Sequence, residues 1–128
     1  MKVGDAVPPL VIESVDPEKM KTMAAILHDP NPIHYDVDLV RRLGMGDGPV
    51  NQGPINLAWL IEMACRFGGG PESLQRVRIR FLGNVFGGER YEATGKVVAL
   101  EDGVAELEVA ATANGRPALA GSAWVRVR

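Results

Sequence analysis

The spacing of apolar residues changes about halfway along the chain. In the first half, apolar positions recur at three- and four-residue intervals between clusters of proline and glycine, as is typical of short helices and loops. From residue 73 onward they alternate with charged residues, as Val77 and Ile79 do with Arg76 and Arg78. A period of two is typical of strands with one buried face. The pattern therefore predicts an α+β domain in which helices precede most of the sheet.

Two short helices are predicted before residue 44. Asp16 is a favourable N-cap and Pro17 suits the first helical position, so the first helix begins there. It ends near His28, because two prolines follow within four residues. Its inward face is expected to consist of Met20, Met23, Ala24 and Leu27. A second helix is predicted over residues 37–43, where glycines end it.

Residues 54–67 form a third helical segment, which is apolar on nearly every side and stops at three consecutive glycines. A helix of this kind must be enclosed. The segment is shorter than the ~20 apolar residues of a membrane span, so we expect protein to enclose it.

Four strands are predicted after this helix, near residues 74–82, 89–100, 104–112 and 117–127. Asp102-Gly103 and Asn114-Gly115 are strong signals for tight hairpin turns. We expect an antiparallel meander that wraps around the apolar helix and buries it. No linker or repeat interrupts the sequence, so residues 1–128 are interpreted as one domain.

Composition excludes several classes of protein. The chain has 128 residues, of which 46% are hydrophobic and 23% charged, with a net charge of −2. This is the ordinary amino-acid composition of a globular protein, and it shows no stripe of basic residues that would bind nucleic acid. Asp5 and Pro8-Pro9 argue against a signal peptide, and the single cysteine, Cys65, cannot form an internal disulfide. We therefore expect a cytoplasmic protein that neither spans nor binds a membrane, with an inert thiol.

Both histidines lie in one short segment, which reads His28-Asp29-Pro30-Asn31-Pro32-Ile33-His34. The prolines stiffen this turn, so a carboxylate and an imidazole are held five residues apart. Such a pair can hold and polarise one water for general acid–base chemistry. The structural alternative is a turn in which Asp29 caps and His34 is a half-buried packing residue. At the end of the preceding helix, His28 is interpreted as a favourable partner of the helix dipole.

The segment from Asp29 to His34 resembles the hydratase motif Asp-x-Asn-Pro-x-His of the MaoC-like (R)-specific enoyl-CoA hydratases and hydroxyacyl-thioester dehydratases. The resemblance extends to Asn51-Gln52-Gly53-Pro54, where that family has its loop into the central helix, and to the predicted strands and the overall length. It implies a single hot-dog domain, an antiparallel sheet wrapped around a long central helix. It also implies pairing with a second hot-dog subunit, as a homodimer or a heteromer.

The resemblance implies a reaction as well. Asp29 would orient and deprotonate the water that adds to C3 of a trans-2-enoyl thioester, and His34 would hold that water and shuttle a proton to or from C2. The backbone N–H of Gly53 would meet the charge on the thioester oxygen at the start of the central helix. Asn31 and Gln52 are the further candidates for the substrate site, and Asn31 is also interpreted as a turn-former. No cofactor is implied, and two histidines and one cysteine do not suggest a metal site.

Three positions depart from the family pattern. His28 stands where the family usually has glycine, and Gln52 where many members have histidine. Pro54 has no N–H, which leaves Gly53 or Ile55 as the oxyanion donor. The form of residues 51–54 and the small size resemble actinobacterial hydratase subunits that handle bulky acyl-CoA substrates such as sterol side chains, often as half of a heteromeric pair.

Other functions remain open at the level of sequence. A hot-dog thioesterase would place its carboxylate on the central helix, where this chain offers only Glu62. A non-catalytic subunit that completes a partner's acyl pocket is the other alternative. Three arginines in the first predicted strand, Arg76, Arg78 and Arg80, fit either coenzyme A phosphates or a solvated face. The acyl chain, the direction, and the choice between coenzyme A and acyl carrier protein are left undetermined by the residues.

Overall fold

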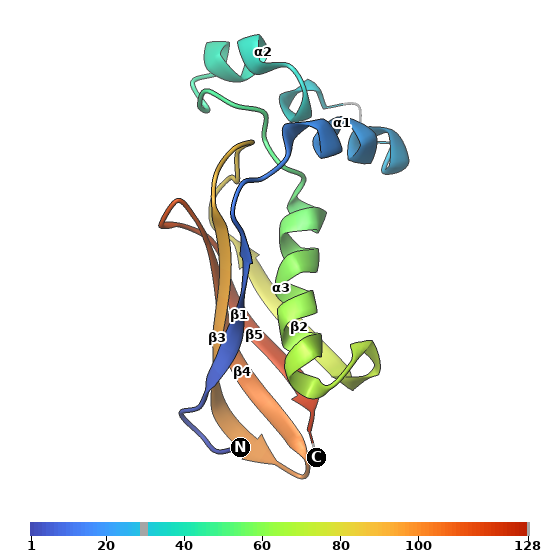
Figure 1. The fold of residues 1–128 in the computed structure, drawn as a ribbon, viewed down its shortest axis with the longest axis vertical. Coiled ribbons are helices and arrows are strands. Elements are labelled where there is room, and N and C mark those ends of the chain that lie inside the picture. Colours follow the sequence, from blue (N-terminus) through green and yellow to red (C-terminus); the bar gives the residue numbers. More distant parts are fainter. Residues whose placement is uncertain (29–30, 128) are drawn as a thin grey trace.

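An antiparallel sheet of five strands lies against one long helix in the computed structural model, which describes residues 1–28 and 31–127 (Figure 1). The strands are β1 (Ala6–Ile12), β2 (Leu74–Phe81), β3 (Tyr91–Glu101), β4 (Val104–Ala113) and β5 (Arg116–Arg126). The long helix is α3 (Gly53–Gly68). Two shorter helices, α1 (Pro17–Ile26) and α2 (Val37–Arg42), precede it, and one-turn 3₁₀ helices cover Pro32–His34 (η1) and Pro71–Ser73 (η2).

The strand order is β1-β3-β4-β5-β2, which corrects the predicted meander. All four predicted strands are present, and the hairpins turn at Asp102 and Asn114, which have φ values of 51° and 47°. However, β2 pairs with β5 and lies at a sheet edge, so only β3, β4 and β5 follow one another. The sequence pattern also does not predict β1. Its two prolines are tolerated because β1 is the other edge, and its register shifts between Val7 and Leu10.

The hydrophobic core lies between α3 and the inner face of the sheet. Leu60, Met63 and Ala64 of α3 are at most 1% exposed, and they belong to the same cluster as Leu107 and Val125 of the strands. Ala58 and Glu62 face outward and are exposed. The prediction that this helix is enclosed on every side is therefore wrong for the single chain, because the sheet covers one face only.

The two short helices form a cap beyond the N-terminal end of α3 (Figure 1). As predicted, Asp16 caps α1 by accepting a hydrogen bond from the Glu18 amide at 2.9 Å. Met20 and Ala24 are buried, but Leu27 is 41% exposed, contrary to the predicted inward face. The helix ends at Ile26, so Leu27 is its C-cap and turns outward.

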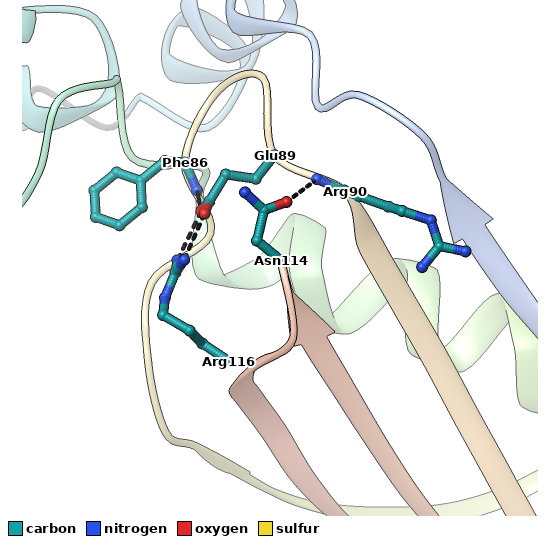
Figure 2. Close-up of polar contacts among 5 residues, drawn as sticks. All are labelled: Phe86, Glu89, Arg90, Asn114 and Arg116. Atoms are coloured by element: carbon teal, nitrogen blue, oxygen red, sulfur yellow. Dashed lines mark hydrogen bonds and ion pairs between the residues drawn. The ribbon is translucent and has the colours of Figure 1, made fainter.

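The loop between β2 and β3 is held by a cluster centred on Glu89 (Figure 2). The Glu89 carboxylate accepts two hydrogen bonds from the Arg116 guanidinium, at 2.6 and 2.8 Å, and one from the Phe86 amide at 2.8 Å. The Glu89 side chain is only 12% exposed. Burial opposes its ionisation, but Arg116 and the Phe86 amide outweigh this effect and hold the pKa of Glu89 below its ordinary value. The cluster thus joins this loop to the β4–β5 hairpin.

Stability should depend on pH through Glu89. Its pKa in the folded state lies below the unfolded value of about 4.3, so its ionised form stabilises the fold above that value. This contribution is lost as pH falls through the folded-state pKa. We expect Glu89→Gln to lower the free energy of unfolding at pH 7 by about 1.5–3 kcal/mol, the range for hydrogen bonds to charged groups. The difference from the native protein should shrink on acidification to pH 3, as measured by urea unfolding at both values. A difference that is unchanged at pH 3 would contradict this account.

Candidate functional site

His34 closes the proline-stiffened turn that the sequence predicts. The turn is η1, with Asn31 as its N-cap and Pro32 at its first position, and the Asn31 side chain accepts a hydrogen bond from the Ile33 amide at 3.2 Å. Proline at this position fixes φ without the loss of a needed donor. The turn directs His34 inward, where the residue is 6% exposed. Asn31 thus acts at least as the turn-former that its type suggested.

The imidazole of His34 is anchored by a backbone carbonyl. Its Nδ1 lies 2.6 Å from the Val50 oxygen. A carbonyl oxygen only accepts hydrogen bonds, so Nδ1 carries the hydrogen, and in the neutral ring the lone pair is on Nε2. This assignment gives His34 a defined tautomer whose Nε2 can accept a proton, as a general base requires.

The segment that supplies this carbonyl is itself fixed on both sides. The Val50 amide donates to the Ile33 carbonyl at 2.8 Å, which ties it to the same turn. On the other side, the Asn51 amide donates to Val85 at 2.7 Å, and the Pro49 carbonyl accepts from Gly87 at 2.8 Å. These bonds make Val50 and Phe86 an antiparallel bridge. The chain from η1 to the start of α3 is therefore braced against the β2–β3 loop.

Gly53 begins α3 three residues after Val50. The amide of Ile55 donates to the Gln52 carbonyl at 3.0 Å, and Pro54 has no N–H. Within residues 1–28 and 31–127, the Gly53 amide has no hydrogen-bond acceptor. Of the two donors that the sequence left open, Gly53 is thus the unsatisfied one at the positive end of the helix dipole.

The ring of Phe81, the last residue of β2, lies over Gly53. A Cβ at Gly53 would be 3.3 Å from Phe81 Cε1, so glycine keeps this approach open. Phe81 is 57% exposed, whereas its alternation with the arginines of β2 predicts an inward position. The reason is that β2 is an edge strand whose end reaches the first residue of α3, which has no side chain to cover the ring.

Gln52 lies beneath the start of α3 and is 1% exposed. Its Nε2 donates to the Met20 carbonyl of α1 at 2.8 Å, and its Oε1 is buried without a partner among the described residues. The side chain therefore ties α1 to the start of α3. Asp29, the carboxylate predicted to act with His34, lies outside the described residues. His28, just before it, is exposed and has a φ of 52°.

The other candidates from the sequence lie elsewhere. Glu62 pairs with Arg66 at 2.7 Å on the outward face of α3. It is nine residues after Gly53, which is about 13 Å along the helix. In β2, Arg78 and Arg80 are exposed, and Arg76 stacks on the Trp124 ring at 5.0 Å. Glu62 therefore lies away from the start of α3.

The described part of the chain offers neither a metal site nor a membrane span. Residues 1–28 and 31–127 contain no group of three or more His, Cys, Asp or Glu side chains that would hold a metal ion. No helix among them is both long and apolar enough to span a bilayer. Cys65 is buried, and burial, with a smaller effect from Glu72, raises the pKa of its thiol.

The Glu89 cluster is the polar feature that sequence reasoning missed. Phe86 and Glu89 lie three residues apart in the β2–β3 loop, but Arg116 follows Glu89 by 27 residues, so no local pattern connects it to them. Only the antiparallel pairing of β4 with β5 brings Arg116 to the β2–β3 loop. The nearest signal in the sequence is the Asn114-Gly115 turn, which places Arg116 at the start of a strand without indicating its partner.

No protein-family model matches the sequence, and no curated protein matches it. Solved structures match the whole chain in shape. An (R)-hydratase from A. caviae involved in PHA biosynthesis has a TM-score of 0.85 and 21% identity, covering 100% of this chain and 98% of its own. The ChsH1–ChsH2 complex from Mycobacterium tuberculosis contains a chain with a TM-score of 0.84 and 17% identity, covering 100% and 99%.

A MaoC-like dehydratase gives a TM-score of 0.91 at 22% identity, and this chain spans 41% of its length. A point mutant of the fluoroacetyl-CoA-specific thioesterase FlK also has this shape, with a TM-score of 0.69, 12% identity and coverage of 98% and 87%. Identities this low show a shared fold, and one fold can support several reactions. The chain has the hot-dog fold of the MaoC-like dehydratases and (R)-hydratases, as the motifs of its sequence predict.

Proposed function

We propose that this protein is a hydro-lyase that acts on acyl thioesters. It would add water reversibly to a trans-2-enoyl-CoA to give a 3-hydroxyacyl-CoA. The observation that carries the proposal is the buried His34, whose Nδ1 is held by the Val50 carbonyl three residues before the unsatisfied amide of Gly53. The fold shared with an (R)-hydratase and a MaoC-like dehydratase supports it.

In the proposed hydration, one water lies between Asp29 and Nε2 of His34. Asp29 removes a proton as the water oxygen bonds to C3, and the C2–C3 π electrons move toward the thioester oxygen. The Gly53 amide donates a hydrogen bond to the resulting enolate. The proton then passes from Asp29 through His34 to C2, while the Val50 carbonyl stabilises the ring when it is transiently cationic. Dehydration is the same sequence in reverse.

Asn31 and Gln52, predicted for the substrate site, are proposed to shape it by holding its backbone. The side chain of Asn31 stabilises the turn before His34, and that of Gln52 fixes the residue before Gly53. The substrate class that we propose is a coenzyme A thioester with a bulky acyl group, such as a sterol side chain. This choice rests on the resemblance of residues 51–54 and of the chain length to hydratase subunits of that kind.

A hot-dog thioesterase is the less supported alternative, although a thioesterase shares the fold. Its carboxylate would be Glu62, which faces outward, pairs with Arg66 and lies about 13 Å along α3 from Gly53. That position is remote from the unsatisfied amide. A purely pocket-completing role is also less supported, since such a subunit would not need both Asp29 in its sequence and an anchored His34.

We further propose that a second hot-dog subunit completes the site. In the described chain, β2 has no neighbour beyond it. Phe81, whose ring lies beside Gly53, is 57% exposed, and Leu82 after it is 53% exposed. A cavity of about 570 Å³ lies along the outward face of α3, lined by residues that include Ile61 and Cys65. Open edges and apolar faces of this kind are usually covered. The partner would be a second copy or a related chain, as in the ChsH1–ChsH2 complex.

Replacement of either acid–base residue should abolish most of the activity. We expect Asp29→Asn and His34→Ala each to lower kcat by roughly 10²–10⁴-fold, the usual effect of a lost acid–base group. The measurement is the ultraviolet absorbance of the enoyl thioester, with crotonyl-CoA and longer or sterol-derived enoyl-CoA. His28→Ala, at the exposed histidine, is the matched control and should keep nearly full activity. Full hydration by both site variants, or thiol release without loss of enoyl absorbance, would refute the assignment.

Association should depend on the end of β2. We expect the chain to form a dimer, alone or with a co-purified hot-dog subunit. Phe81→Lys should weaken this dimer by roughly tenfold or more, because a cation would lose the free energy of burying an apolar ring. Sedimentation over a dilution series measures this. Leu100→Lys changes an exposed apolar residue near the β3–β4 turn and should leave the mass unchanged. A fully active monomer would contradict the proposal.

A further inference from the structure

The ion pair between Glu89 and Arg116 is absent from the proposed reaction, yet its contacts lead to His34. We propose that Glu89 is a positioning residue: through the backbone of Phe86 and Val50, it fixes the carbonyl that holds the His34 ring. The inference rests on the proposed function, because it gives this ion pair a part in the chemistry of His34. It adds a residue that no motif in the sequence indicates.

The first link runs from His34 to the short extended segment 49–51. Backbone polar groups of extended residues point alternately to opposite sides. The N–H and C=O of Val50 therefore both face η1, where they bind Ile33 and His34. On the other side of the segment, the Pro49 carbonyl accepts a hydrogen bond from the Gly87 amide, and the Asn51 amide donates one to the Val85 carbonyl. A shift of residues 85–87 would consequently move the Val50 carbonyl and the imidazole with it.

The second link is the attachment of residues 85–87 to Glu89. In the bridge with Val50, the N–H of Phe86 points away from residues 49–51, so it needs an acceptor elsewhere. Glu89 Oε1 provides this acceptor at 2.8 Å (Figure 2). A charged acceptor makes this bond stronger than an ordinary amide–carbonyl bond. The carboxylate thus controls the position of the peptide that braces Val50.

The third link is the attachment of Glu89 to the sheet. Arg116, the first residue of β5, donates two hydrogen bonds to the carboxylate, and its guanidinium lies 5.8 Å from the centre of the Phe86 ring. The backbone of Glu89 adds a bond from the Val15 amide at 2.9 Å. The Phe86 ring also lies against Gly46, where a Cβ would be 2.8 Å from the ring. The rigid sheet therefore sets the position of Phe86 through Glu89.

Two conservative variants separate positioning from simple stabilisation. Glu89→Gln keeps an oxygen within reach of the Phe86 amide but removes the charge. Glu89→Asp keeps the charge but shortens the reach by one methylene. If Glu89 acts through the Phe86 amide, Asp should disturb His34 more than Gln does, whatever their order in thermal stability. Glu108→Ala, at an exposed glutamate of β4, is the control for loss of a carboxylate.

The chain has only two histidines, so its imidazole NMR spectrum contains two ring systems. We expect native His34 to show a slowly exchanging Nδ1 proton. Glu89→Asp should speed its exchange and lower kcat, each by roughly 10–100-fold, with KM within about twofold, since small displacements near reacting atoms have effects of this size. Glu89→Gln keeps an acceptor for the Phe86 amide but loses the ion pair with Arg116, so it should change both quantities less than Glu89→Asp does. Glu108→Ala should leave both quantities within about twofold.

Two outcomes would overturn the inference: equal behaviour of the Asp and Gln variants at Glu89, or a His34 Nδ1 proton whose exchange neither variant changes. A native protein without hydratase activity would refute the proposed function alone. The two failures are distinguishable because the NMR comparison is independent of turnover.

Discussion

The hydrogen bond from His34 to the Val50 carbonyl connects the parts of the molecule on which the proposed chemistry depends. It joins a proline-stiffened turn to the segment that enters the long helix, so that the imidazole and the helix start share one rigid backbone. Because a carbonyl can only accept, the same bond selects the tautomer of the ring. This contact therefore helps to hold the imidazole in place and leaves the lone pair of the neutral ring on Nε2.

The start of α3 combines a conformational and an electrostatic requirement. Pro54 suits an early helical position because it needs no acceptor, and Gly53 before it leaves space for the ring of Phe81. The first amide is thus left without an acceptor among the described residues, at the positive end of the dipole. The hydrophobic contact of α3 with the sheet, centred on Leu60 and Met63, keeps this end of the helix in place.

The chain exposes features that a single subunit leaves uncovered. One edge of the sheet is β2, and the exposed ring of Phe81 at its end lies beside Gly53. The outward face of α3 carries a cavity next to the ion pair of Glu62 and Arg66. The ring of Phe81 lies at the start of α3, and the cavity lies on the outward face of the same helix. Both features therefore lie along α3, whose first residue belongs to the proposed site.

Local patterns in the sequence determined the helix cap at Asp16, the glycine stop of α3, the two hairpin turns and four of the five strands, because each depends on residues a few positions apart. The turn at His34 was likewise predictable from its prolines and Asn31. Strand β1 was not predictable, because its two prolines disfavour a strand in the sequence pattern and its pairing is made with the distant strand β3. The place of β2 beside β5, the Val50 carbonyl at His34 and the cluster of Glu89 with Arg116 were decided only by the tertiary structure. Each brings together residues at least 16 positions apart, and no local pattern records such a pairing.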